Sequence, residues 1–169
     1  MRSNVGGVGL NMNKQALQKI FNNGLSAFGF TKKSPDYWYR VGVGVVQVIN
    51  LQKSAYGMQF YVNLCCVPEG FEVPDMPTPK ESQCPIRIRL TAVHPEQRKR
   101  IESLLDLENS SFEDAEREQG VNALVTELIV PFFADVQTVE ALKSAITSNK
   151  LDEGAVMFAV RKYLGIEQE

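Results

Sequence analysis

The side chains best suited to binding or catalysis stand at alternating positions in two short stretches of the chain. Gln59, Tyr61, Asn63 and Cys65 alternate with apolar residues in the first stretch, and Arg87 and Arg89 do so in the second. Because successive side chains of a β-strand point to opposite faces of the sheet, each set is predicted to share one face. Arginine, tyrosine and amide side chains bind anions, planar groups or a partner protein. The sequence therefore predicts a candidate binding face formed by Gln59, Tyr61, Asn63, Arg87 and Arg89.

The strand next to this pair extends the face in one of two ways. Depending on its register, it adds either Gln47 or the pair Asn50 and Gln52. The competing interpretation is a solvated face without a partner, which antiparallel sheets commonly have.

The cysteines and the single histidine give a weaker signal for chemistry. A Cys65 thiol beside Arg87 or Arg89 would have a lowered pKa and would be a nucleophile, although packing without chemistry is the simpler interpretation. Cys65 and Cys66 are neighbours and Cys84 is left over, so the three cysteines form neither a disulfide framework nor a zinc site. His94 precedes Pro95 and is expected at a helix start. We expect no metal site and no cofactor.

Composition excludes several classes of protein. The 169 residues carry a formal net charge of -2, which argues against a nucleic-acid partner because phosphate binding needs a basic excess. The longest apolar run near the end, residues 128–134, contains Pro131 and is far shorter than the ~20 residues that span a bilayer. The N-terminus has no apolar segment typical of a signal peptide. We therefore expect a cytoplasmic protein without a membrane partner, with residues 1–12 disordered and residues 13–169 forming a single α+β domain.

A predicted hairpin over residues 43–66 positions the candidate face. Two β-branched and aromatic runs flank a short polar link at residues 53–57, which is the strongest hairpin signal in the chain. Residues 86–92 alternate as a last strand, and residues 37–41 form either a first strand or a bulged lead into the second. These patterns predict α+β structure with a single antiparallel sheet of three to four strands in chain order.

Helical periodicity accounts for most of the remaining chain. Apolar spacing near 3.6 predicts helices over residues 13–27, 96–108, 138–148 and 152–164, and over a long stretch whose second half is residues 121–133. Pro131 is expected to kink or end that long helix. Helices packed mainly on one sheet face would leave the odd-numbered residues of the two clean strands facing outward. Residues 68–83, with four prolines, are predicted to be a long loop, either functional or mobile.

Several of these segments together resemble a known family. They are the end of the first helix with Gly29, Phe30, Lys32 and Lys33, the aromatic strand at residues 38–40, and the motifs at residues 48–54, 60–64 and 84–90. The set is similar to the bacterial family called domain of unknown function 4304, over roughly residues 13 to 150. The resemblance implies a small α+β domain and supplies no catalytic residues.

Two functional hypotheses follow. The first is a non-enzymatic protein-binding module that uses the polar sheet face and the 68–83 loop against a protein partner. The alternative is a small-ligand binder or an enzyme centred on Arg87, Arg89, Tyr61 and Cys65. A concave pocket that holds both arginines with Tyr61 would favour the ligand, and a flat, wide face would favour a protein.

Overall fold

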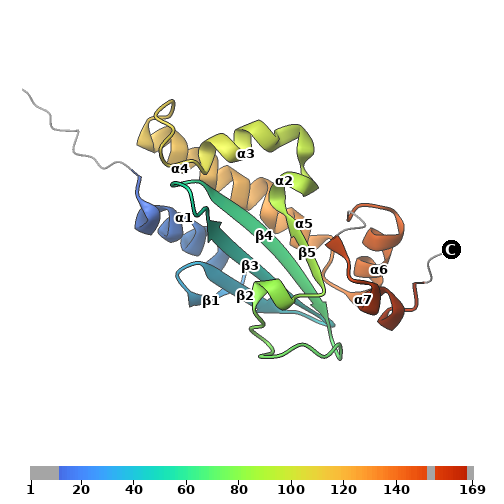
Figure 1. Ribbon diagram of the computed structural model, residues 1–169. Coiled ribbons are helices and arrows are strands. Elements are labelled where there is room, and N and C mark those ends of the chain that lie inside the picture. The colour runs from blue at the N-terminus through green and yellow to red at the C-terminus, as the bar shows by residue number, and fades with distance from the viewer. Residues whose placement is uncertain (1–11, 152–154, 167–169) are drawn as a thin grey trace, which may run out of the picture.

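An antiparallel sheet runs through the molecule in the order β1-β2-β3-β4-β5. The computed structural model describes residues 12–151 and 155–166, and within these ranges the sheet has five strands (Figure 1). Their bounds are β1 (Thr31–Ser34), β2 (Tyr37–Val41), β3 (Val45–Lys53), β4 (Phe60–Pro68) and β5 (Ile86–Arg89). The α+β class and the antiparallel sheet are thus confirmed, whereas the predicted count of three to four strands is wrong.

The extra strand and the shortened last strand have local causes. β1 lies in a stretch for which the sequence predicted no strand, because its exposed residues, among them Lys32 and Lys33, show no apolar alternation. Lysines are common on strands at the edge of a sheet, where they discourage pairing with other chains. The strand predicted to reach residue 92 ends at Arg89, because α2 (Leu90–Val93) begins at the next residue. The central hairpin is confirmed, with β3 paired to β4 from Val45↔Pro68 to Lys53↔Phe60.

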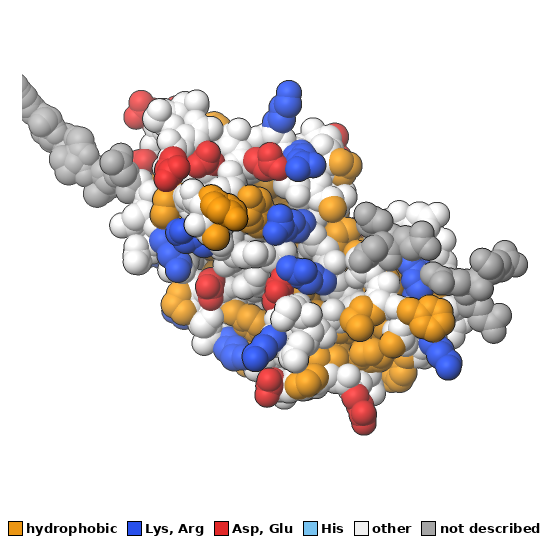
Figure 2. Space-filling view, viewed as in Figure 1, with side chains coloured by type: hydrophobic (Ala, Val, Ile, Leu, Met, Phe, Trp, Pro, Cys, Tyr) orange, Lys and Arg blue, Asp and Glu red, His pale blue; other side chains and the backbone are white. Residues whose placement is uncertain are grey.

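One face of the sheet is covered by helices α1 (Lys14–Ser26) and α4 (Asp114–Ala123), the π-helix η4 (Leu124–Ile129) and helix α5 (Val130–Ala134). In Figure 1 they lie behind the sheet, and η2 (Glu81–Gln83) lies in front of it. Figure 2 shows the front face in the same view, with Lys and Arg side chains gathered over the region of β4 and β5. The described chain also contains η3 (Pro95–Gln97), α3 (Arg98–Leu104), α6 (Val139–Thr147) and α7 (Phe158–Tyr163).

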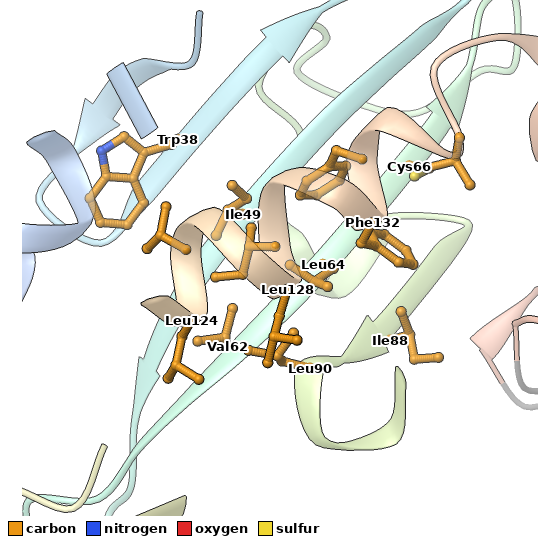
Figure 3. Close-up of a cluster of buried hydrophobic side chains, with 14 of the residues drawn as sticks. Trp38, Ile49, Val62, Leu64, Cys66, Ile88, Leu90, Leu124, Leu128 and Phe132 are labelled. Carbon is orange, nitrogen blue, oxygen red and sulfur yellow. The ribbon is translucent and has the colours of Figure 1, made fainter. Parts of the chain in front are cut away.

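The main hydrophobic core lies between the helices and the sheet. Figure 3 shows Leu64 at its centre, among side chains of η4 and α5 and of the neighbouring strands. The even-numbered residues of β4 up to Cys66 and those of β5 point into this core, namely Phe60, Val62, Leu64, Cys66, Ile86 and Ile88. The alternation predicted from the sequence is therefore confirmed for both strands.

Pro131 lies inside the long helical segment instead of ending it. The π-helix η4 directly precedes it, and the N–H group of Val130 bonds to the carbonyl of Val125, five residues earlier. Pro131 then occupies the first turn of α5, where a missing N–H group costs little. The wider turn thus lets the helix pass the proline and continue to Ala134, so the helix does not end at Pro131.

Arg117 is the main structural residue that the sequence patterns did not reveal. It lies in the acidic run 113–118, which reads as a solvated helix face, yet it is only 3% exposed. Its guanidinium donates to the carbonyls of Ser103, Leu104, Asp106 and Asn109, and burial lowers its pKa. Arg117 therefore fastens α4 to the turn that follows α3.

Two predictions concern the ends of the chain. Residues 1–11 of the segment expected to be disordered lie outside the described residues, and the N–H group of Met12 donates to Asp114 Oδ1 at 3.2 Å. Asp152, the expected start of the last helix, also lies outside them, and α7 begins later because Val156 forms a β-bridge to Ile86. Across the described ranges, no helix is long and apolar enough to cross a membrane.

Candidate functional site

The sheet face opposite the helices is divided into two halves. One half, here called the covered half, consists of Tyr37, Val46, Val48, Cys65 and Val67. Cys84, Phe71 and Val73 pack over it from the segment between β4 and β5. The Tyr37 hydroxyl donates to the carbonyl of Pro79 at 2.5 Å, which ties the segment down further. The loop predicted at residues 68–83 is thus a lid on a second, smaller core, and the predicted outward face is open only over the other half.

The other half, here called the polar half, combines residues of three strands. Register places Asn50 opposite Asn63 and Asn63 opposite Arg89, while Gln52 pairs with Tyr61 and Arg87 with Cys65. The polar half is therefore formed by Asn50, Gln52, Tyr61, Asn63, Arg87 and Arg89. Of the two alternatives for β3, the structure selects Asn50 and Gln52. Gln47 lies under the helices, where its Nε2 donates to the carbonyls of Phe133 and Val136.

Arg89 stacks on Tyr61 at the centre of the polar half. Its guanidinium carbon lies 4.1 Å from the centroid of the Tyr61 ring, and its Nη2 lies 3.5 Å from Gln52 Oε1. Beneath them Asn63, which is 0% exposed, donates from Nδ2 to Asn50 Oδ1 at 3.0 Å and to Gln52 Oε1 at 2.9 Å. The buried Asn63 amide thus holds Gln52, and Gln52 in turn contacts Arg89.

Helix α3 adds a cation to this site. An open groove is lined by Tyr61, Arg87 and Arg89 from the sheet, Thr91 from α2, and Arg98 and Glu102 from α3, and we call it the arginine groove. Arg87 pairs with Glu81, and Arg98 Nε lies 2.8 Å from Glu102 Oε1. Arg89 has no carboxylate partner among the residues that the structure describes. The sequence patterns missed Arg98, because its helical spacing indicated only an exposed basic helix face.

Two predicted residues lie outside this constellation. Gln59 lies just before β4, and its Nε2 donates to the carbonyl of Glu102 at 3.1 Å instead of joining the polar half. Cys65 lies across from Arg87, but it is 0% exposed within the covered half. A hydrogen bond with the Cys84 thiol raises the pKa of Cys65, and burial raises it further. Burial and the raised pKa thus favour packing without chemistry, the simpler of the two interpretations of Cys65, over a nucleophilic thiol.

The remaining candidates for chemistry lie apart from the arginine groove. His94 does not line it, and its Nδ1 lies 3.2 Å from Glu96 Oε1 near the protein surface. Burial raises the pKa of the Cys66 thiol, which lies in the main core. In the described part of the chain, no group of three His, Cys, Asp or Glu side chains is placed to hold a metal ion. The arginine groove thus offers guanidinium donors and an aromatic face, which suit anions and planar groups.

Comparison with known proteins gives a family and no further relative. The sequence model of the family described as "Domain of unknown function (DUF4304)" matches residues 21–135, more than half of the chain. The match confirms the resemblance seen in the sequence motifs. No curated protein and no solved structure matches the chain.

Proposed function

The chain belongs to the DUF4304 family, and we propose that it is a non-enzymatic protein-binding module that uses the polar half of its sheet. The observation that carries the proposal is the stack of Arg89 on Tyr61 in an open groove that Arg87 and Arg98 also line. Arginine and tyrosine are among the residues that most often dominate the energy of protein interfaces.

Preorganisation of the site supports a role in binding. The Asn63 and Gln52 amides are hydrogen-bonded to each other, Gln52 contacts Arg89 of the stack, and both residues belong to the central hairpin. A side chain that is already ordered before binding loses less conformational entropy when a partner arrives. The polar half therefore has fixed donors at its surface, which a purely solvated sheet face does not require.

The surroundings of the arginine groove favour binding over catalysis. Neither a thiol nor the imidazole of His94 lines it, so the groove lacks both a cysteine nucleophile and a histidine base. The carboxylate of Glu102 is already paired with Arg98.

A small anionic ligand is a second candidate occupant. It is favoured by the groove itself, which brings Arg87, Arg89 and Tyr61 together as a ligand site would. Because the groove is open to solvent and not enclosed, it also fits a segment of a larger molecule, and we place the protein partner first.

Affinity capture from the organism that carries the gene tests the proposal. The wild-type protein is compared with the double variant Arg87→Ala/Arg89→Ala and with the matched control Lys19→Ala/Lys32→Ala, whose two lysines belong to α1 and β1 and line a separate hollow. We expect a protein that is retained by the wild type and the control and is lost from the arginine variant. Equal capture by all three proteins, or no captured protein, would contradict the proposal.

A further inference from the structure

We propose that the arginine groove binds an extended acidic segment of the partner protein, whose carboxylates at positions i and i+2 meet Arg87 and Arg89. This inference rests on the proposed function and names the chemistry of the partner.

The charge of the arginine groove points to an acidic occupant. The groove is lined by Arg87, Arg89 and Arg98. Glu81 pairs with Arg87, and Glu102 pairs with Arg98. Arg89 lacks such a pairing within the described ranges, and it is held by the Tyr61 ring and by Gln52. The groove therefore carries a local positive charge on a chain whose formal net charge is -2. A carboxylate can accept two parallel hydrogen bonds from one guanidinium, which makes it a suitable partner for Arg89.

The spacing of the arginines points to an extended occupant. Arg87 and Arg89 are two residues apart on β5, and both side chains are exposed on the same side of the strand. Two residues of a strand span about 7 Å. A partner segment in an extended conformation repeats its own side chains at the same interval, so carboxylates at i and i+2 match the two guanidinium groups.

Glu81 competes with the acidic segment for Arg87. It pairs with Arg87, whose side chain is nevertheless 42% exposed. A carboxylate of the partner must share Arg87 with Glu81, and the two like charges repel each other. Removal of the Glu81 charge should therefore tighten binding, whereas removal of the Arg87 charge should weaken it.

A nucleic acid is the competing macromolecule, since a single strand also presents regularly spaced anions. The groove favours the acidic protein segment, because Glu81 and Glu102 lie beside the arginines where a phosphate backbone needs a continuous basic track.

Fluorescence anisotropy with labelled probes tests the inference. One probe is an octapeptide of alternating glutamate and serine, and the second has the same composition arranged as Glu-Glu-Ser-Ser repeated twice. The third probe is an oligothymidylate of eight nucleotides. We expect the alternating peptide to bind about fivefold more tightly than the paired one at low ionic strength, and its binding to weaken as salt is added.

Variants assign the effect to the groove. Arg89→Ala and Arg87→Ala should each weaken binding of the alternating peptide by about fivefold, since each removes one exposed ion pair. Glu81→Gln should strengthen it by about twofold to fivefold, and Lys19→Ala/Lys32→Ala should leave it unchanged.

The outcomes separate this inference from the proposed function. Equal binding of the two peptides overturns the extended register, and tighter binding of oligothymidylate overturns the acidic protein segment. If neither peptide binds but affinity capture still depends on Arg87 and Arg89, the partner chemistry is wrong and the proposed function stands. Capture that is indifferent to both arginines overturns the proposed function itself.

Discussion

Neighbouring residues of β4 lie in very different surroundings. Leu64 points into the main core beneath η4 and α5, whereas Asn63 points the other way, into a hydrogen-bonded set of amides under Tyr61 and Arg89. Apolar packing needs only shape and burial, but a buried amide needs specific partners. The helix-covered face thus stabilises the fold through apolar packing, while the hydrogen-bonded amides of the polar half hold exposed side chains in position.

Two arginines extend this comparison beyond the sheet. Arg117 and Arg89 each lie over an aromatic ring, with guanidinium carbons 5.3 Å from the Phe112 centroid and 4.1 Å from the Tyr61 centroid. Arg117 donates to four backbone carbonyls and is buried, whereas Arg89 is exposed and has one long contact to Gln52. The first is committed to the fold, and the second keeps its donors for another molecule.

Truncation in the main core should have the largest effect on stability. Leu64→Ala is expected to lower the free energy of unfolding by about 4 kcal/mol, because it opens a cavity where Leu64 is 0% exposed. Urea denaturation followed by circular dichroism measures this loss. A loss under about 1 kcal/mol would mean that the helices do not pack tightly on this face.

Loss of the buried arginine comes next. Arg117→Ala should lower the free energy of unfolding by about 3 kcal/mol, because it leaves the carbonyls of Ser103, Leu104, Asp106 and Asn109 without this donor. Arg117→Lys should restore part of the loss, since an ammonium group still donates up to three hydrogen bonds. The same denaturation experiment checks both variants, and an unchanged stability of Arg117→Ala would refute the structural role.

Alkaline pH should destabilise the protein through thiols on both sheet faces. Burial raises the pKa of Cys66 on the helix-covered face, and contact with Cys84 together with burial raises the pKa of Cys65 on the covered half. Folding therefore favours the protonated thiols, so their stabilising effect is complete below the ordinary thiol pKa of about 8.5 and is lost as pH rises above it. Each thiol should contribute a loss of about 1.4 kcal/mol per pH unit in that range.

Unfolding curves from neutral pH to pH about 10 measure this slope. The variant Cys66→Ala should show a shallower slope than the wild type, because it removes one of the titrating groups. Identical slopes would show that the Cys66 thiol titrates alike in the folded and unfolded chain.

The smallest effect on stability is expected at the polar half. Arg89→Ala should change the free energy of unfolding by less than about 0.5 kcal/mol, since exposed polar contacts contribute little. Comparison of its urea midpoint with that of the wild type checks this. A loss as large as that of Arg117→Ala would place Arg89 among the structural residues and would remove the contrast.

The sequence predicted what depends on local periodicity. Alternation and the turn at residues 53–57 sufficed for the central hairpin and for the directions of Leu64 and Asn63, because these follow from strand geometry alone. It failed where long-range packing decides. Phe71, Val73 and Cys84 follow no strand or helix period, so their cover over Cys65 could not be foreseen.

The candidate site was foreseen only in part for the same reason. Tyr61 lies on β4 and both Arg87 and Arg89 lie on the neighbouring β5, so strand alternation alone predicted all three on one face. Arg98 reaches them only because α2 and α3 turn back along the sheet, and Gln59 leaves them because its amide reaches the backbone of Glu102. The spacing of residues in the sequence indicates neither the position of Arg98 nor that of Gln59.

Photo-cross-linking in cells of the native organism tests the central claim most directly. The photoreactive residue p-benzoyl-phenylalanine replaces Tyr61 in one protein and Lys19, an exposed residue of α1, in another. If the polar half is the interaction surface, position 61 will form a defined protein adduct that disappears with Arg89→Ala, and position 19 will not. An adduct from position 19 alone, or one from position 61 that persists without Arg89, would contradict the account.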